Sequence, residues 1–370
     1  MNVGGPAVQV TGLMGGLPSD LFEQRLIIGE CGPDEVDYVK TQAPDIPVTV
    51  ISELGRTIRP LDDVRAFIRL VKEIRRFQPD IIHTHTAKAG FVGRLAAQFS
   101  RGPVSVVHTY HGHLLHGYFG PLATRLVVLT ERLLERISDH LVAVGEQVRA
   151  DLLVAGIGNR TEFSVINPGI ELPAVPSRDD SARELGLDPS KRYLAFIGRV
   201  TRIKRPDRWP EIASTIIKDF PETGFLVVGD GDELEKLQQH AAQAHLPFHF
   251  LGTRSDITTV LAIAEGVILT SDNEGTPISL IEAGMAGLPV VATDVGSVAE
   301  VVQEGVTGWL TTTDVDQIVR AASELLGNPT EAASRGKRAR LLAQETFGFE
   351  RFIRDYAKLY LGLIGRSNQK

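Results

Sequence analysis

Two glutamates in the second half of the chain have a spacing and surroundings that could bind a ligand. Glu274 and Glu282 stand on either side of the predicted start of one helix. Glu282 lies inside that helix without a basic residue beside it, and a buried carboxylate in such a position needs hydroxyl donors, for example a ribose diol. The alternative interpretation is a pair of solvated glutamates, because Glu is mostly an exposed residue.

The residues between the two carboxylates predict an anion site at the helix start. Thr276 can cap the helix, and Pro277 suits its first position. The backbone N–H groups of Ile278, Ser279 and Leu280 would then be free to bind an anion. A diphosphate fits this requirement.

Positively charged side chains that could stabilise a leaving diphosphate follow another predicted strand. Arg199 and Lys204 lie on the loop after residues 193–198, and positioned cations stabilise negative charge as it develops. Three further arginines share this loop, so the alternative is a solvated basic loop of small energetic weight. The preceding strand and the turn at Gly198 favour the phosphate site.

A cluster of histidines raises the question of a metal site. Those between residues 83 and 116 are His83, His85, His108, His111, His113 and His116. Zinc sites usually add cysteine or carboxylate ligands, and this stretch contains neither. His83 and His108 alternate with apolar residues and are expected to be hydrogen-bonded core histidines. Asp230-Gly231-Asp232 spells the DxD of metal-dependent transferases, but Asp232 is expected to cap a helix there. We expect no metal.

Composition indicates a globular protein of two domains. The chain has 370 residues, 43% of them hydrophobic, and a net charge of −7, so a large core is available and a nucleic-acid binder is not indicated. The single cysteine, Cys31, cannot form a disulfide within the chain, which is typical of a reducing cytoplasm. No apolar run is long enough to span a bilayer.

Two amphipathic helices could lie on an anionic membrane. They are predicted at residues 61–77 and 121–140, and each combines an apolar stripe with several arginines. The alternative is that both are ordinary helices covering a sheet, since any core-facing helix has such a stripe.

Short apolar runs alternate with amphipathic ones, which predicts parallel sheets built from βαβ units. The expected strands of the first half are residues 26–29, 47–51, 80–85, 104–109, 140–144 and 163–166, and those of the second half are 193–198, 224–229, 247–251, 266–270 and 289–293. The expected domains are residues 1–172, joined by a last helix in 349–370, and residues 173–348, with a hinge in 167–176. Both are Rossmann-like and doubly wound. The polar motifs follow strands, so we expect them to meet at an interdomain cleft.

The chain resembles the retaining glycosyltransferases of family 4, which have the GT-B fold. The segment from Glu274 to Glu282 is similar to their E-x7-E signature. The likeness extends to residues 2–7, 83–90, 108–113, 167–170 and 198–207, and so to essentially the full chain. Within the family it is most similar to bacterial transferases that build exopolysaccharide or lipid-linked glycans.

The resemblance implies how the donor is bound. Arg199 and Lys204 would hold its phosphates, Glu274 its sugar and Glu282 its ribose, while the base would lie near Arg254. The implied donor-binding set is Gly4, Gly5, Arg199, Lys204, Arg254, Glu274, Gly275, Thr276, Pro277, Ile278 and Glu282.

The resemblance also implies an acceptor side in the first domain. His111 would lie beside the reacting sugar, and His85 and Lys88 would line the acceptor site with it. The residues implied in catalysis are His111, Arg199, Lys204 and Glu274.

The implied activity is retaining, metal-independent transfer of a hexose or N-acetylhexosamine from a UDP-sugar to a sugar or lipid-linked acceptor, in bacterial glycan synthesis. The expected location is the cytoplasm, with peripheral contact at an anionic membrane as an option. The alternatives are a catalytically silent nucleotide-sugar binder and a nucleotide-sugar 2-epimerase of the same fold. A dinucleotide oxidoreductase is disfavoured, since no strand is followed by G-x-G-x-x-G.

One departure from the family concerns its first strand. Relatives carry a strand before the Gly-Gly motif, whereas here Met1 stands directly at that loop. We therefore expect a gap in the sheet of the first domain, filled by another segment, or else a start codon upstream of Met1.

Overall fold

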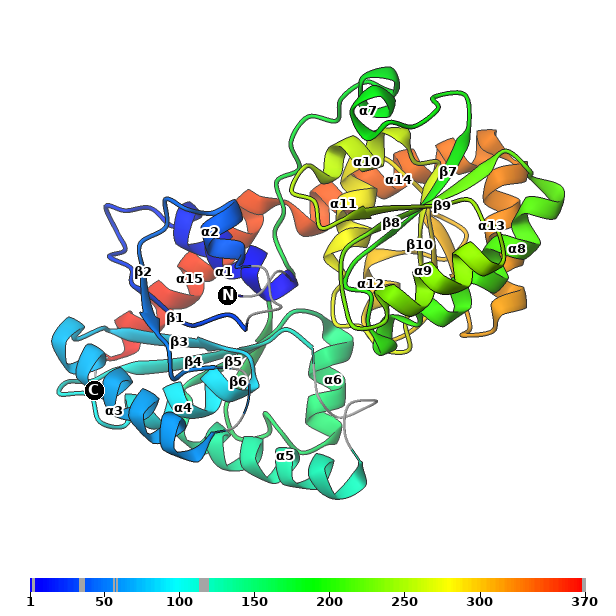
Figure 1. Ribbon diagram of the computed structural model, residues 1–370. Helices are drawn as coiled ribbons and strands as arrows, with labels where there is room; N and C mark the ends of the chain where they lie inside the picture. Colours follow the sequence, from blue (N-terminus) through cyan, green and yellow to red (C-terminus); the bar gives the residue numbers. More distant parts are fainter. Residues whose placement is uncertain (2–3, 33–36, 56, 58, 113–119, 368–370) are drawn as a thin grey trace. The chain divides into compact units, whose positions relative to one another are not determined.

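The computed structural model describes residues 1, 4–32, 37–55, 57, 59–112 and 120–367 (Figure 1). The chain divides into two compact units. One comprises Met1–Gly169 with Phe349–Lys370, and the other comprises Ile170–Gly348. The division falls after Gly169, within the segment 167–176 that is predicted to be a hinge. Each unit is an α/β structure around parallel strands.

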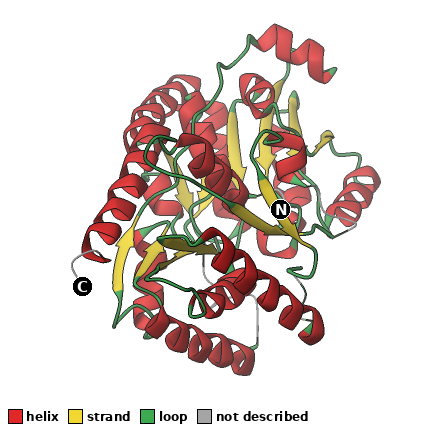
Figure 2. Cartoon of the chain, turned by 90° about the vertical axis from the view of Figure 1, so that its left-hand side faces the viewer, coloured by secondary structure: helices red, strands yellow, loops and turns green. Residues whose placement is uncertain are grey.

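The unit Ile170–Gly348 is built on one six-stranded sheet. Its strands are β7 (Arg192–Ile197), β8 (Thr223–Val228), β9 (Phe248–Gly252), β10 (Gly266–Leu269), β11 (Val290–Thr293) and β12 (Gly308–Thr311), in the order β12-β11-β10-β7-β8-β9. Its helices are α7 (Arg178–Leu185), α8 (Trp209–Asp219), α9 (Leu234–Gln243), α10 (Ile257–Ile263), α11 (Ile278–Ala286), α12 (Val298–Val301), α13 (Val315–Gly327) and α14 (Pro329–Phe347). Figure 2 shows helices on both faces of the strands.

The alternation of side chains along β7 explains this two-sided packing. Leu194 and Phe196 point to a core that includes Trp209, whereas Ala195 and Ile197 point to a second core on the other face of the sheet. All four are buried, as expected of a parallel strand covered on both faces. The order of the strands reverses between β7 and β10, and in such sheets ligands bind at the carboxyl ends beside that reversal.

The strands of the other unit form two separate sheets. β1 (Leu26–Gly29) pairs with β2 (Val48–Ile51), and β3 (Ile81–His85), β4 (Ser105–Tyr110), β5 (His140–Ala143) and β6 (Glu162–Val165) form a four-stranded sheet in that order. All pairings are parallel. Within the described residues, no strand precedes α1 (Gly5–Gly16), and none joins β1 to β3.

Helices join the two sheets of this unit. α3 (Pro60–Phe77) contributes Ala66 and Leu70 to a core that also contains Ile27 of β1 and Ile82 of β3. The remaining helices are α2 (Tyr38–Gln42), α4 (Ala87–Ala97), α5 (Pro121–Leu134), α6 (Glu146–Val154) and α15 (Phe349–Ser367). The predicted helix 121–140 is shorter than expected, since α5 passes into a 3-10 turn at Glu135–Ile137 and β5 begins at His140.

The last helix, α15, packs within the first unit. Phe352, Tyr356, Tyr360 and Leu363 form its buried stripe, which contacts Leu13, Val107 and Val142. Their spacing places them on one face of a helix. At Gly16 a Cβ atom would lie 2.4 Å from Cδ1 of Ile353, so a larger residue there would force the Ile353 side chain to shift.

Candidate functional site

In the unit Ile170–Gly348, two of the predicted site residues form an ion pair. Lys204 lies at the end of a 3-10 turn after β7, and Glu274 lies on the loop between β10 and α11. Nζ of Lys204 contacts Oε1 of Glu274. The same oxygen accepts a hydrogen bond from Ser271 Oγ at 2.5 Å. Both charged side chains are largely buried, at 16% and 9% exposed, so water screens this pair less than a surface ion pair.

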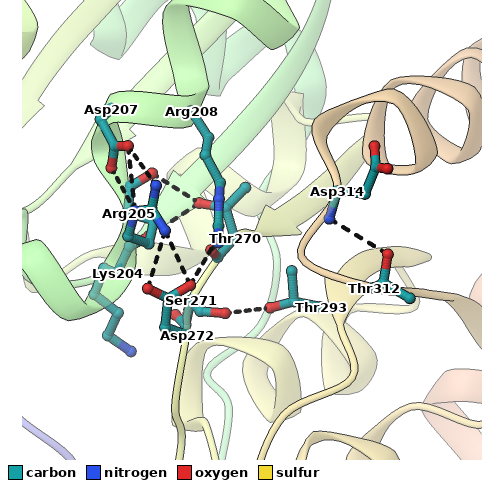
Figure 3. A network of polar contacts seen from close by, with 10 residues as sticks. All are labelled: Lys204, Arg205, Asp207, Arg208, Thr270, Ser271, Asp272, Thr293, Thr312 and Asp314. Carbon is teal, nitrogen blue, oxygen red and sulfur yellow. Dashed lines mark hydrogen bonds and ion pairs between the residues drawn. The ribbon is translucent and has the colours of Figure 1, made fainter. Parts of the chain in front are cut away.

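A network of arginines holds the Lys204 loop against the loop after β10 (Figure 3). Arg205 and Arg208 both bind Asp272, at 3.0 and 2.7 Å. Arg208 also donates to the carbonyl oxygen of Thr270 at 2.5 Å, and Thr270 Oγ1 donates to the carbonyl oxygen of Lys204 at 2.9 Å. Figure 3 shows the Lys204 side chain extending away from the arginines. The network therefore fixes the backbone of Lys204 and leaves its ammonium group for the site.

The sequence did not predict this network, since the extra arginines of the loop indicate only a solvated surface. Arg208 is 7% exposed, and a buried guanidinium requires partners. Arg205 has φ of 55°, an uncommon backbone conformation for a residue other than glycine. The sequence feature that could have indicated this network is Asp272, an acidic residue two positions before Glu274 that could pair with the arginines of the loop after β7.

Close backbone contacts bring the neighbouring loops together. A Cβ atom at Gly229, after β8, would lie 2.0 Å from the carbonyl oxygen of Gly198, after β7. Gly296, after β11, has φ of 54°, and its Cβ would lie 1.8 Å from the carbonyl oxygen of Glu274. Larger residues at these two positions would displace the loops that carry Arg199 and Glu274.

The remaining predicted cations differ in their contacts. The Arg199 side chain is exposed and forms no hydrogen bond or ion pair with the described part of the chain, so its guanidinium is available to a ligand. Arg254 is engaged, since it binds Asp256 through two nitrogens at 2.5 and 3.0 Å and lies 3.6 Å from Glu184. The hydrogen bond from Arg254 lowers the pKa of Asp256. A base contact by Arg254 stays a prediction.

The helix that carries Glu282 begins one residue later than predicted. α11 starts at Ile278 and its N-cap residue is Pro277, so the prediction that Thr276 is the N-cap residue and Pro277 the first residue of the helix is wrong. The Leu280 amide donates to the Pro277 carbonyl at 3.2 Å and is not free as expected. The amides of Ile278 and Ser279 remain, as the first two of a helix, without an intrahelical acceptor.

Glu282 has the uncompensated carboxylate that its sequence context predicts. It forms no hydrogen bond or ion pair within the described residues, and burial raises its pKa to about 7. Ile278 and Met285 lie three or four residues away on the same helix face. A hydroxyl pair from a ligand would supply the donors that this carboxylate lacks.

In the other unit, His85 and His111 meet at the carboxyl ends of β3 and β4. Nδ1 of His85 lies 2.8 Å from Nε2 of His111. Desolvation by burial lowers the pKa of His111 to about 4 and that of His85 well below its usual value. The pair is therefore neutral at pH 7 and can both donate and accept hydrogen bonds.

His83 and His108 are hydrogen-bonded as expected of core histidines. His83 lies 2.5 Å from the Tyr360 hydroxyl and 2.7 Å from Thr109 Oγ1, and His108 lies 2.8 Å from Thr84 Oγ1. Burial lowers the pKa of His83 to about 3. The contact between His83 and Tyr360 joins β3, the strand that ends at His85, to α15.

Lys88 does not join the two histidines. Its ammonium group lies 2.5 Å from Asp63 Oδ1 and 2.5 Å from the carbonyl oxygen of Thr57. Gly4 is the N-cap of α1, with φ of 156°, and Gly5 is the first residue of the helix. The acceptor role of Lys88 and the phosphate contact of the two glycines stay predictions.

No group of three or more metal-binding side chains occurs among the residues that the structure describes. His113 and His116 lie outside them. At the DxD triplet, α9 has Glu233 as its N-cap, so the prediction that Asp232 caps this helix is wrong.

Comparison with known proteins covers almost the whole chain. Residues 3–173 match the family described as Glycosyltransferase Family 4, and residues 177–342 match Glycosyl transferases group 1. The chain is 28% identical over 319 residues to UDP-Gal:alpha-D-GlcNAc-diphosphoundecaprenol alpha-1,3-galactosyltransferase of Escherichia coli, covering 82% of this chain and 80% of the relative. It is 24% identical to N-acetyl-alpha-D-glucosaminyl L-malate synthase of Bacillus anthracis, covering 82% and 80%.

Solved structures show the same fold. Anabaena HepE in complex with UDP and glucose superposes with a TM-score of 0.82 at 21% identity, covering 97% of this chain and 96% of that one. Sucrose-phosphate synthase from Thermosynechococcus elongatus superposes with a TM-score of 0.83 at 20% identity, covering 98% and 94%. These structural likenesses support the GT-B fold.

Proposed function

The chain belongs to the family 4-like glycosyltransferases with the GT-B fold, and we propose that it transfers a hexose or N-acetylhexosamine from a UDP-sugar to a sugar or lipid-linked acceptor. The observation that carries the proposal is the ion pair of Lys204 and Glu274 on the loops after β7 and β10, where the strand order of one sheet reverses, with Glu282 on α11, the helix that follows the second loop. A cation, a sugar-binding carboxylate and an uncompensated carboxylate together suit a diphosphate, a sugar and a ribose.

The ion pair between Lys204 and Glu274 suggests how the donor enters. A diphosphate would draw the Lys204 ammonium from the carboxylate, and Glu274 would turn to the sugar hydroxyls. Arg199 would add a second cation, and in many enzymes the stabilisation of developing charge contributes most to the rate enhancement.

The names of similar proteins support a UDP-sugar as donor and a lipid-linked acceptor. The Escherichia coli relative is named for UDP-Gal and for a diphosphoundecaprenol-linked acceptor, and the Anabaena structure holds UDP and glucose. We propose a retaining reaction without a metal, with front-face displacement in which the leaving phosphate accepts the acceptor proton. That mechanism requires no separate side-chain base.

Mass spectrometry with a panel of UDP-sugars and lipid-diphosphate-linked acceptors tests the proposal. We expect UDP release with one donor only when an acceptor is present, with retention of anomeric configuration and with full activity after treatment with a chelator. UDP release without any acceptor would favour the 2-epimerase, and UDP binding without turnover would favour a silent binder. Loss of activity on chelation, restored by manganese, would contradict the metal-independent reaction.

A further inference from the structure

α5 presents an apolar stripe that the described part of the chain does not cover. Its members Leu122, Leu126, Leu129 and Leu133 are 78%, 65%, 55% and 53% exposed. Their spacing of three and four residues places them on one face of the helix. Val154, the last residue of α6, is 90% exposed and precedes Ala155, whose carbonyl accepts a hydrogen bond from Arg132 on α5. Figure 1 shows α5 along the lower edge of the first unit.

The charges on α5 are divided between its two faces. Its exposed charges are cationic, on Arg125 and Arg132, and Arg136 in the following turn is exposed as well. The acidic side chains point inward. Glu131 is 7% exposed and receives hydrogen bonds from Arg94 at 2.8 and 3.0 Å.

Glu135, in the turn after α5, is a second acidic residue that points inward. It is 1% exposed and accepts a hydrogen bond from the amide of Arg160 at 2.5 Å. The outer surface of residues 121–136 therefore consists of leucines flanked by arginines that have no acidic partner within the described residues. That composition matches an interfacial helix, in which leucines enter the acyl boundary and arginines meet anionic headgroups.

α3 provides an internal comparison, since it also exposes apolar residues. Leu61, Val64 and Ile68 are 77%, 57% and 60% exposed. The two arginines nearest to them are paired, because Arg65 contacts Asp62 at 3.2 Å and Arg69 contacts Glu53 at 3.0 Å, whereas the exposed Arg75 and Arg76 lie in the last turn of the helix. The surface of α3 thus carries both signs of charge, and an anionic bilayer would repel part of it.

We propose that the outer face of α5, rather than α3, docks on an anionic lipid bilayer. A second copy of the chain is a poorer occupant, since two-fold pairing of the stripe would bring like-charged arginines together. No helix in the described residues is long and apolar enough to cross a membrane, and docking on the surface requires none. The proposal does not depend on the identity of the acceptor.

Co-sedimentation with vesicles of phosphatidylglycerol and phosphatidylcholine tests the α5 surface. We expect binding to these vesicles at low salt that weakens with added salt and is absent with phosphatidylcholine alone. Leu126→Ser with Leu129→Ser should reduce the partition coefficient on the order of tenfold or more. Arg125→Gln with Arg136→Gln should reduce it to a similar extent. The matched control, Val64→Ser with Ile68→Ser on α3, should bind like the unmodified chain.

Two further measurements keep the result interpretable. Circular dichroism and UDP affinity should be unchanged in every variant, because the substituted side chains are exposed and lie outside the proposed donor site. Leu126→Trp should show fluorescence quenched by brominated lipids. Equal vesicle binding by the α5 variants, no binding at low salt, or a dimer that the α5 substitutions dissociate would each overturn the proposal.

Discussion

The two units place their polar residues in different electrostatic states at the ends of similar parallel strands. In Ile170–Gly348, Lys204 and Glu274 are ion-paired, and Asp272 binds two arginines. In Met1–Gly169, His85 and His111 are held neutral by burial. The first arrangement suits a diphosphate and the second suits uncharged hydroxyls. Transfer of a sugar requires both, because the leaving group is charged and the acceptor hydroxyl is not.

The largest expected effect comes from removing the cations of Ile170–Gly348. Arg199→Ala and Lys204→Ala should each lower the rate of transfer on the order of 100-fold or more, because each removes a stabiliser of developing negative charge. Arg202→Ala, an exposed cation in the same loop, is the matched control and should have little effect. Steady-state kinetics with the UDP-sugar measure this. Near-normal turnover in both variants would mean that the diphosphate binds elsewhere.

The carboxylates of the same unit should separate binding from transfer. Glu282→Ala should weaken UDP binding by roughly ten- to a hundredfold, as expected for loss of a charge-assisted hydrogen bond. Glu274→Ala should mainly lower transfer, because Glu274 is assigned to the sugar. Calorimetry with free UDP distinguishes the two. Undiminished affinity in Glu282→Ala would remove its ribose assignment.

A smaller effect is expected at the neutral pair. His111→Ala should lower transfer by roughly three- to tenfold, the value of one hydrogen bond between uncharged groups, and should leave UDP affinity unchanged. His240→Ala, at an exposed histidine of the other unit, serves as the control. A parallel loss of UDP affinity would contradict the separation of roles between the units.

The two units should also respond in opposite directions to pH. The pKa of His83 is about 3 in the folded chain against 6.5 for an unperturbed histidine. Its contribution to the free energy of unfolding is therefore greatest above pH 6.5 and is lost as the pH falls. The pKa of Glu282 is about 7 in the folded chain against 4.5 for an unperturbed glutamate. Its contribution to the free energy of unfolding is therefore greatest below pH 4.5 and is lost as the pH rises through 7. Between pH 7.5 and 5, each change is on the order of 2 kcal/mol.

Hydrogen exchange, corrected for the intrinsic effect of pH, resolves this difference. Between pH 7.5 and 5, amides of β3 and β4 should lose protection, and those of β10 and β11 should gain it. Glu282→Gln should abolish the gain, and His83→Gln should reduce the loss. The same direction of change in both units would refute the electrostatic contrast.

Apolar periodicity was sufficient to predict most of the strands. Leu26–Gly29 begins and ends where expected, and most other predicted strands agree within one residue at each end, because parallel strands buried on both faces are short apolar runs. β12 was missed, since Gly308–Thr311 begins with glycine and contains few aliphatic residues. The start of α11 was predicted at Pro277, one residue before its observed start at Ile278.

The surroundings of a candidate site residue were predictable where its neighbours in the sequence determine them. The isolated carboxylate of Glu282 is an example, because no cation stands near it in the sequence. The network around Asp272 was not predictable. Arg205 and Arg208 lie more than 60 residues before Asp272 in the sequence, and only tertiary packing brings the loop after β7 to the loop after β10. Likewise, nothing in the sequence shows that Lys88 is held by Asp63.

The packing of α15 has a consequence for the order in which the protein matures on the ribosome. Phe352 and Tyr356 complete a core whose other members include Leu13 and Val107. All of Ile170–Gly348 is synthesised between these two sets of residues. At about 5–20 residues per second, the early strands wait roughly 10–40 s for their last helix, while the later unit can fold independently. The unit whose synthesis begins first is therefore completed last.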